Sequence, residues 1–516
     1  MKTESRCLRM IKKKMVRVLT VAGLLACLAS GCTSGGSSVG KEAAADEIKK
    51  GGFTVAASCH DPQIIREGDT YYMFGSHMVG AKCQDLRKWN YFANGVDAAN
   101  TLFDNLLTEP YAAFDFVGKN TDNGYSVWAS NVIYNETMKK YVMYFCTTSS
   151  YVKSTLCFAI ADNIEGPYTY VDTILYSGYG KSNISETNLY DVLGKNADIS
   201  RYLEYGGYNN KEWPNCIDPA IFTDADGRMW MNYGSWSGGI FLLEIDPTTG
   251  YPIYPVDDKD ADPYYGYRLI GGGHHSAEGP YIQYDAENGY YYLFVSYGDL
   301  QSDGGYQIRQ FRSEKPTGPY VDVAGNTLED QDDHFNYGLK MMGNYTFPSL
   351  NYTYMAPGGQ STFQDDDGKY YITYHQRFDD GTEYHEPRVH QMYTNEDGWF
   401  VAAPFATMGE TLSEKGYKKS DVSGTFYVVN HGTDISSKIR EAEAYTFADG
   451  KVTGGEKSGT YEVKEGTDYI TITLDGVVYK GVLMEMTDEA ENPVFCFSAA
   501  GDNEETLWGV QYIQKE

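Results

Sequence analysis

The segment Asp218–Phe222, which reads Asp-Pro-Ala-Ile-Phe, opens a plan that recurs along the chain. It is an apolar strand followed by a tight turn at Asp226-Gly227 and then by an aromatic strand, Met229–Asn232. A turn of this type between two such runs is the strongest short-range signal of a β-hairpin. The same plan occupies four other stretches, Pro62–Ser76, Trp128–Thr148, Glu278–Tyr297 and Gln360–Arg377.

Five units at intervals of about 60 to 90 residues predict a five-bladed β-propeller, because each interval leaves room for two outer strands per blade. The alternative topology for the same hairpins is a β-sandwich. Long helical periodicity is absent from the sequence, which argues against a doubly wound α/β fold. Beyond about Gly416 the sequence alternates regularly, as in Tyr469–Leu474, and predicts a separate small antiparallel β-barrel.

The predicted organisation is all-β, and the length of 516 residues exceeds the usual size of a single domain. We expect a lipoprotein-type signal peptide in residues 1–31 and a flexible linker in residues 32–55. The five-bladed propeller then takes residues 56–415, and the C-terminal barrel takes residues 424–516.

Composition narrows the classes of partner. The chain holds 71 Asp and Glu against 42 Lys and Arg, a formal net charge of −29, which argues against nucleic acid as a partner. Abundant Tyr and Gly, 47 and 55 residues, favour short strands joined by tight turns. The cysteines beyond Cys32 form no Cys-x-x-Cys pair, so structural zinc is not expected, and their disulfide state stays open.

The N-terminus has the pattern of an export signal. Basic residues precede the apolar run Val18–Ala29, which is too short to span a bilayer but fits the apolar region of a signal peptide. The run ends at Leu28–Cys32, which resembles a bacterial lipobox with Leu28 one place further from the cysteine than usual. We therefore expect a cell-surface lipoprotein that touches the membrane only through a lipid on Cys32. Ordinary secretion is the alternative.

Three of the five units begin with an acid, namely Asp61, Asp218 and Glu278. They are predicted to share one register, at which the other two units have Ala129 and, approximately, Gly358. If the innermost strands run parallel around one axis, equal register brings the three carboxyl groups to one mouth of the central channel. Asp before Pro also starts ordinary turns, so each acid alone is a weak signal.

Three carboxyl groups at one mouth are typical of glycoside hydrolysis. Inversion at the sugar carbon needs an acid for the leaving oxygen and a base for water, about 6.5 to 9.5 Å apart. A third carboxylate near the acid raises the acid's pKa by like-charge repulsion, which keeps it protonated near neutral pH.

Several segments resemble glycoside hydrolase family 43: His60–Pro62, Tyr208–Pro219, Gly234–Ile240 and His274–Tyr281. Two more, Gly338–Tyr345 and Tyr374–Phe378, resemble the longer endo-α-1,5-L-arabinanases of that family, and the C-terminal part resembles their lipocalin-like domain. The resemblance implies a five-bladed propeller that hydrolyses the arabinan of pectin with inversion. By position, it implies that Asp61 is the general base, that Glu278 is the general acid, and that Asp218 tunes and orients the acid.

The resemblance also implies a calcium ion in the central channel, held by His375 and mostly by waters. A buried, hydrogen-bonded imidazole is the alternative, since calcium seldom takes imidazole ligands. Trp128 matches a substrate-stacking position of the family, and Trp236 and His275 are weaker substrate-binding candidates near the mouth. Many relatives have Pro-Gly-His-Asn-Ser where this chain has Pro357–Ser361, Pro-Gly-Gly-Gln-Ser, which leaves the channel contacts of that loop unassigned.

Two other functions stay open at this point. One is an exo-acting arabinofuranosidase or β-xylosidase of the same family, which a cleft blocked at one end would favour. The other is a surface glycan-binding lipoprotein without catalysis, for which the loss of one acid would have been expected, whereas all three are present. The sequence leaves open the choice between branched and linear arabinan, the oligomeric state and the role of the C-terminal domain.

Overall fold

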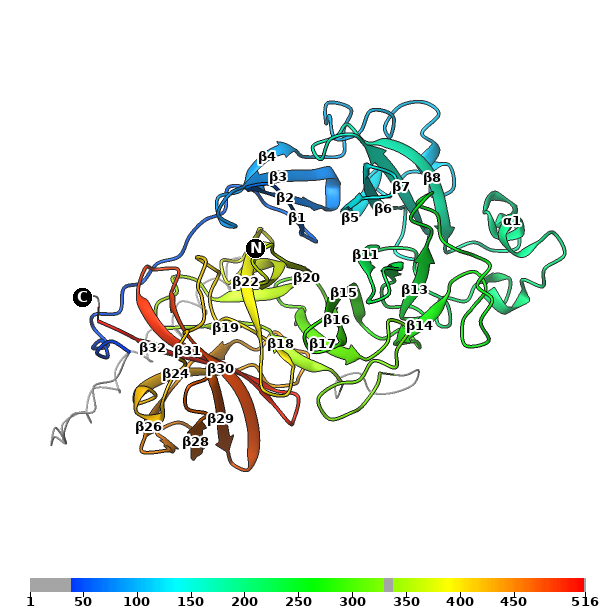
Figure 1. Cartoon of the computed structure of the whole chain (residues 1–516). Coiled ribbons are helices and arrows are strands. Elements are labelled where there is room, and N and C mark those ends of the chain that lie inside the picture. The colour runs from blue at the N-terminus through cyan, green and yellow to red at the C-terminus, as the bar shows by residue number, and fades with distance from the viewer. Residues whose placement is uncertain (1–38, 329–336, 515–516) are drawn as a thin grey trace, which may run out of the picture. The chain divides into compact units, whose positions relative to one another are not determined.

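Five sheets of mainly antiparallel strands surround a central axis in the computed structural model, which describes residues 39–328 and 337–514 (Figure 1). The innermost strands β1, β5, β11, β15 and β20 point toward that axis from five sides. The prediction of a five-bladed propeller is thus confirmed. The predicted signal peptide and Cys32 lie outside the described residues.

The first three blades are regular four-stranded sheets in chain order. Blade 1 contains β1 (Gln63–Glu67), β2 (Thr70–Gly75), β3 (Val79–Cys83) and β4 (Asn90–Ala93). Blade 2 contains β5 (Ser126–Asn135), β6 (Lys140–Thr148), β7 (Ser154–Ala161) and β8 (Thr169–Tyr176). Blade 3 contains β11 (Ala220–Thr223), β12 (Met229–Tyr233), β13 (Ile240–Ile245) and β14 (Tyr267–Ile270).

Blades 4 and 5 complete the ring. Blade 4 contains β15 (Ala277–Asp285), β16 (Tyr290–Tyr297), β17 (Gln307–Ser313) and β18 (Leu339–Met342). Blade 5 is six-stranded, in the order β23-β22-β21-β20-β19-β25. Its strands are β19 (Tyr345–Thr346), β20 (Tyr354–Gln364), β21 (Tyr370–Phe378), β22 (His385–Thr394), β23 (Phe400–Ala402) and β25 (Arg440–Glu441).

The described helices are short and lie in connections. They are α1 (Leu189–Leu193) and the 3₁₀ turns η1 (Ser76–Met78), η2 (Ala112–Phe114), η3 (Ile184–Glu186), η4 (Ser200–Tyr202) and η6 (Lys419–Asp421). The long connection between blades 2 and 3 holds η3, α1 and η4 together with a small hairpin of β9 (Leu203–Glu204) and β10 (Gly207–Tyr208). No helix among the described residues is long and apolar enough to cross a membrane.

The C-terminal strands close into a barrel, as predicted, and the structure shows that the barrel has eight strands. They are β24 (Gly424–Asn430), β26 (Glu443–Ala448), β27 (Lys451–Thr453), β28 (Gly459–Val463), β29 (Tyr469–Leu474), β30 (Val477–Thr487), β31 (Pro493–Gly501) and β32 (Thr506–Tyr512). Buried aromatic rings such as Phe426, Phe447 and Phe497 pack against one another in its core. Alternating residues of the strands supply this apolar filling, and closure leaves no free sheet edge.

The stretch expected to be a flexible linker, residues 32–55, makes regular backbone contacts from Val39 onward. Ala43 N–H donates to the carbonyl of Tyr512 at 2.9 Å, and Gly51 N–H donates to the carbonyl of Ser349 at 2.9 Å. Val39 and Val55 are buried. The apolar side chains in this Gly- and Ala-containing stretch give it surface to bury, so its backbone finds partners and is held in place.

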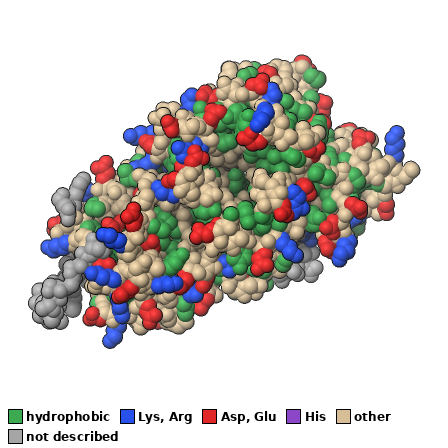
Figure 2. Space-filling view, viewed as in Figure 1, with side chains coloured by type: hydrophobic (Ala, Val, Ile, Leu, Met, Phe, Trp, Pro, Cys, Tyr) green, Lys and Arg blue, Asp and Glu red, His purple; other side chains and the backbone are tan. Residues whose placement is uncertain are grey.

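Charged side chains of both signs are interspersed on the face of the molecule shown in Figure 2. Acidic and basic groups alternate over short distances there, although the chain as a whole carries a net charge of −29. Neighbouring charges of opposite sign screen one another, so the field of this face is weaker than the net charge alone would suggest.

One backbone feature repeats in all five blades at the channel. A residue with positive φ occurs at the same level of each innermost strand, and the five are Asp61 (53°), Ala129 (47°), Asp218 (56°), Gly279 (56°) and Gly359 (58°). In blades 2, 4 and 5 this residue and the next one oppose a single residue of the neighbouring strand, which is a β-bulge. In each blade, this residue and the two residues that follow it line one cavity on the axis.

The predicted common register of the three acids needs a correction. Asp61, Asp218 and Gly279 are equivalent, so Glu278 lies one residue before the shared position. In blade 5 the equivalent residue is Gly359, whereas the sequence comparison gave Gly358 approximately. The reason is the spacing to the following proline. Asp61 and Asp218 directly precede a Pro that lines the cavity, whereas Gly279 separates Glu278 from the equivalent Pro280.

Candidate active site

The structure brings Asp61, Asp218 and Glu278 together at the channel. Asp61 and Asp218 both line the axial cavity, and Glu278 precedes Gly279 of the same cavity. The electrostatic field of Asp61 reaches both other carboxyl groups. The site is therefore a cluster of three mutually influencing acids contributed by blades 1, 3 and 4.

Asp61 is held in the charged form. Its Oδ2 accepts hydrogen bonds from Ser76 Oγ at 2.6 Å and from His60 Nδ1 at 2.8 Å. Burial raises the pKa of Asp61, but the charge of His60 and the hydrogen bonds from His60 and Ser76 outweigh burial and leave the pKa below its ordinary value. A carboxylate that stays ionised is suited to act as a base toward water.

The pKa of Glu278 is shifted in the opposite direction. Burial raises its pKa, the charge of Asp61 adds to the effect, and the result is a pKa above the ordinary value. Three donors oppose the shift only in part: Tyr306 Oη at 2.7 Å, Trp236 Nε1 at 2.9 Å and Ser235 Oγ at 3.1 Å. A carboxyl group that keeps its proton longer is suited to act as a general acid.

Asp218 is bonded to the backbone that carries Glu278. Its Oδ2 accepts a hydrogen bond from Gly279 N–H at 3.1 Å, so it fixes the peptide next to the acid. Burial and the charges of Asp61 and Glu278 raise the pKa of Asp218 well above its usual range. Because like-charge repulsion is mutual, Asp218 and Glu278 disfavour each other's ionisation.

Two adjacent glycines of blade 5 leave the space that this cluster needs. A Cβ on Gly359 would lie 2.4 Å from Asp61 Oδ1 and 2.8 Å from His375 Nδ1. A Cβ on Gly358 would lie 2.1 Å from the ring of Tyr306. The next residue, Gln360, donates from Nε2 to the carbonyl of Gly279 at 2.6 Å. This is a channel contact of the Gly359-Gln360 pair, which stands where many relatives have His-Asn.

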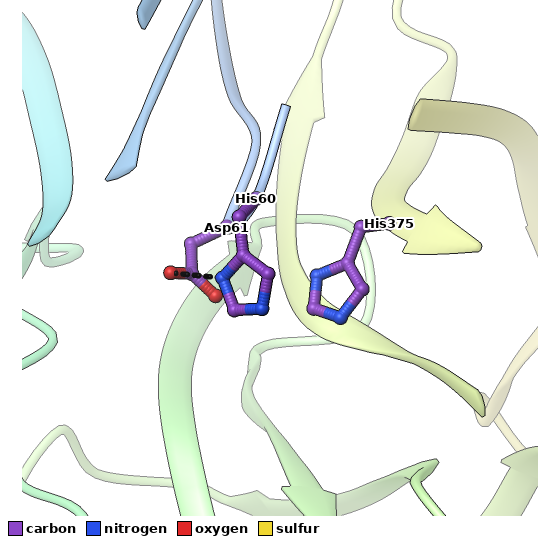
Figure 3. A group of neighbouring side chains, drawn as sticks. All are labelled: His60, Asp61 and His375. Atoms are coloured by element: carbon purple, nitrogen blue, oxygen red, sulfur yellow. Dashed lines mark hydrogen bonds and ion pairs between the residues drawn. The ribbon is translucent and has the colours of Figure 1, made fainter. Parts of the chain in front are cut away.

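His375 lies beside Asp61 and parallel to His60, with ring centroids 4.1 Å apart (Figure 3). It is completely buried, and neither of its ring nitrogens has a hydrogen-bond partner among the described residues. Burial, together with the charge of His60, lowers the pKa of His375 well below its usual value. It is therefore the neutral imidazole that can bind a metal ion.

The surroundings of His375 restrict the kind of ion that fits. Ligand atoms of His60, Asp61 and His375 lie within 4.8 Å of one another. Calcium takes six to eight oxygen ligands, whereas this group contains one carboxylate, which is already bonded to Ser76 and His60. The residues fit a cation that keeps most of its water and contacts the protein through His375.

The three aromatic candidates have different surroundings. Trp236 lies at the acid, because its indole N–H donates to Glu278, and its ring is 5.3 Å from that of His274. Trp128 is half-buried in β5 directly before the channel residue Ala129. His275 is half-buried two residues before the start of β15. Substrate binding by these three residues remains a prediction.

Sequence reasoning missed several residues of the site. Tyr306 and Ser76 bond directly to the acids but carry no motif, and one Tyr among 47 gives no signal. Tyr151 is 58% exposed, and its ring lies 6.2 Å from that of His274. A line of rings therefore leads from solvent at Tyr151 through His274 to Trp236 and the acid.

Comparison with known proteins identifies the family. The sequence model of the glycosyl hydrolases family 43 matches residues 192–400, and that of a C-terminal lipocalin-like domain matches residues 404–509. The extracellular endo-alpha-(1->5)-L-arabinanase 2 of Bacillus subtilis is 38% identical over 467 residues, which cover 88% of this chain and 92% of the relative. This chain belongs to glycoside hydrolase family 43.

Other relatives of this family 43 hydrolase agree. An extracellular endo-alpha-(1->5)-L-arabinanase of Thermotoga petrophila is 36% identical over 472 residues, 88% of this chain and 94% of the relative. A solved family 43 structure from Bacillus licheniformis has a TM-score of 0.77 and 37% identity, covering 90% of this chain and all of the other. The solved endo-1,5-alpha-L-arabinanase from Thermotoga petrophila has a TM-score of 0.76 and 35% identity, with the same coverage. The resemblance found in the sequence is confirmed.

Proposed function

We propose that this chain is an endo-α-1,5-L-arabinanase that cleaves arabinan with inversion at the sugar carbon. The observation that carries the proposal is the meeting of Asp61 and Glu278 at one channel mouth, with pKa values shifted in opposite directions. The choice of arabinan is supported by two relatives that are named endo-arabinanases and match 88% of the chain.

In the proposed reaction Glu278 gives its proton to the glycosidic oxygen as the bond from that oxygen to the sugar carbon breaks. Asp61 takes a proton from a water molecule, and the water oxygen bonds to the sugar carbon from the opposite face. The leaving chain departs as an alcohol and the sugar is released with inverted configuration. Solvent then returns the proton from Asp61 to Glu278. Asp218 positions the peptide of Glu278 through its bond to Gly279 N–H, and the charge of Asp61 helps to keep the acid protonated.

The test is the cleavage of linear arabinan with product sizing by chromatography and anomeric analysis by NMR. The wild-type chain is expected to release mixed oligosaccharides early, with inverted configuration in the first product. Release of arabinose alone from the first turnover would favour the exo-acting alternative, and retained configuration would contradict the assignment of Asp61 as base. Full activity of Glu278→Gln on arabinan would contradict its role as acid.

We also propose that the channel holds a calcium ion through His375. Support comes from two buried ring nitrogens without a partner among the described residues and from a neutral imidazole. Bound there, the ion would supply positive charge beside Asp61. Thermal unfolding of chelator-treated protein is expected to shift to higher temperature when calcium is added, and His375→Gln is expected to abolish that shift. A shift that persists in the variant would contradict this site.

For localisation we propose export followed by lipid attachment at Cys32. Both relatives named above are described as extracellular, which supports export. The anchor rests on the lipobox-like sequence alone. Expression of the full chain in a bacterium, followed by fractionation, should place it with membranes, and Cys32→Ser should release it. A wild-type chain found free in the medium would favour ordinary secretion, and a Cys32→Ser variant that stays with membranes would contradict the lipid anchor at Cys32.

A further inference from the structure

A second cavity of about 390 Å³ lies against blade 5, apart from the residues of the axial cavity. Its walls come from the segment Gly51–Thr54, from Tyr352 just before β20, and from the hairpin of β21 and β22. Its volume is in the range of about 300–1,000 Å³ found for small-molecule sites. The proposed reaction uses none of these residues.

Two exposed tyrosines line this cavity. Tyr352 is 57% exposed and Tyr384 is 46% exposed, so both present ring surface to solvent. Tyr352 packs edge-on against Phe378, with ring centroids 6.0 Å apart, so it is supported from behind. A supported Tyr ring offers an apolar face with a polar edge, which suits the CH face and the hydroxyls of a sugar.

The cavity is adjacent to the active site through the alternation of β22. Tyr384, Glu386 and Arg388 all line the cavity, as expected for residues at a spacing of two. His385, between the first two, faces the other way, and its ring lies 5.3 Å from His60 and 5.5 Å from His375. The cavity therefore lies next to the group of His60, His375 and His385, on the other side of the start of β22.

The floor of the cavity contains a buried cation with an unused donor. Arg388 donates from Nη1 to Glu386 at 2.9 Å and from Nη2 to the carbonyl of Phe53 at 3.2 Å. Its Nε has no partner among the described residues, although the side chain is almost fully buried. The bonds to Glu386 and Phe53 hold the guanidinium group in place, so Arg388 gives the cavity a fixed floor with a positive charge.

The charged residues that line the cavity favour neutral over acidic ligands. The charged residues that line the cavity are Asp380, Glu386 and Arg388, which sum to one net negative charge. An acidic sugar such as a uronate is disfavoured by this balance, whereas a neutral sugar meets both donors and acceptors.

We propose that this cavity is an accessory subsite that binds a neutral arabino-oligosaccharide segment and holds the polymer beside the catalytic channel. The identity of the sugar rests on the proposed function. One occupant fits the aromatic rim, the fixed floor at Arg388, the charge balance and the proximity to His385. It is the same polysaccharide chain that the channel cleaves.

The test compares a long and a short substrate in the full chain. In the double variant Tyr352→Ala/Tyr384→Ala, the ratio of kcat/KM on linear arabinan to that on arabinotriose is expected to fall about tenfold. The fall should come from KM on the polymer, since the cavity makes no contact with the reacting bond. Tyr205→Ala removes a fully exposed tyrosine elsewhere and should leave the ratio unchanged. The double variant Tyr352→Phe/Tyr384→Phe keeps both rings, so its ratio should stay close to that of the wild type.

An unchanged ratio in the double Ala variant would overturn the subsite, and so would equal losses on both substrates. Gel retardation of Glu278→Gln by linear arabinan and by polygalacturonate provides a second measurement. Weakened retardation by arabinan after the two Tyr→Ala changes is expected, whereas retardation by polygalacturonate that depends on the tyrosines would overturn the neutral-sugar assignment. If the wild-type chain cleaves no arabinan, the proposed function fails, and tyrosine-dependent retardation by arabinan would still support the subsite.

Discussion

Blades 1 and 2 present the same backbone to the channel but different side chains. Asp61 and Ala129 both have positive φ, 53° and 47°, and both contact Ser76, whose Oγ donates to Asp61 and accepts from Ala129 N–H at 2.9 Å. The strained backbone is therefore formed whether or not an acid is present. The carboxylate in blade 1 serves the chemistry of the channel, and the fold does not require it.

The largest expected effect is on catalysis, and it tests whether the carboxylate of Asp61 serves the reaction and not the fold. Asp61→Asn keeps the shape and the tolerance of Asn for positive φ but removes the base, so kcat on arabinan should fall by about 10²–10⁴-fold. The melting temperature should stay close to that of the wild type, measured by calorimetry, because Ala already occupies the equivalent place in blade 2. A large loss of stability would show that the acid has a structural role that Ala129 does not reveal.

A second prediction concerns the missing side chain in blade 5. Gly359→Ala places a methyl group where Asp61 Oδ1 and His375 Nδ1 now lie, and kcat should fall by about 10–100-fold because small displacements at the reacting groups are costly. Gly68 is the matched control, since it has the same φ of 58° but open space where a Cβ would lie. Gly68→Ala should carry the backbone strain alone and leave kcat unchanged.

The third prediction concerns the acid in blade 4. The hydroxyl of Tyr306 lowers the pKa of Glu278, so Tyr306→Phe should raise that pKa. The alkaline limb of the kcat/KM profile, which reports loss of the acid's proton, should move to higher pH. The Phe ring keeps the stacking on His375, which lies 5.6 Å away. A shift to lower pH would show that Tyr306 does not stabilise the ionised acid.

The smallest effect is expected on stability at Asp218. Its pKa in the folded chain is raised, so the folded state holds this proton at pH values where the unfolded state has lost it. Stability is therefore lost as pH rises above the unfolded value of 3.8 toward the folded value. Asp218→Asn removes this loss, and its melting temperature should exceed that of the wild type at pH 8 by about 1–3 °C.

The difference between Asp218→Asn and the wild type should vanish at pH values well below the unfolded value of 3.8, where both the folded and the unfolded wild-type chain hold the proton. Melting curves at several pH values check the sign. A variant that is less stable at pH 8 would mean that the bond from Gly279 N–H outweighs the repulsion among the acids.

Much of the propeller was predictable because hairpin turns and aromatic strands are local signals. Asp61 and Asp218 could be placed in register, since each precedes a Pro and an apolar strand. Glu278 was set one residue off, because it stands two residues before the equivalent Pro280, with Gly279 between them. Tyr306 could not be found, since it lies just before β17, 28 residues from Glu278 in the sequence, and its place depends on the absence of a side chain at Gly358.

The pairing of residues 41–51 sets an order of events during synthesis. Lys41 and Ala43 bond to Gln514 and Tyr512, and Gly51 bonds to Ser349, so every one of these partners is translated hundreds of residues later. While the ribosome is still working, these bonds cannot form. Residues 41–43 become fixed only after β32 has been made, so this part of the chain stays without these partners until synthesis is almost complete.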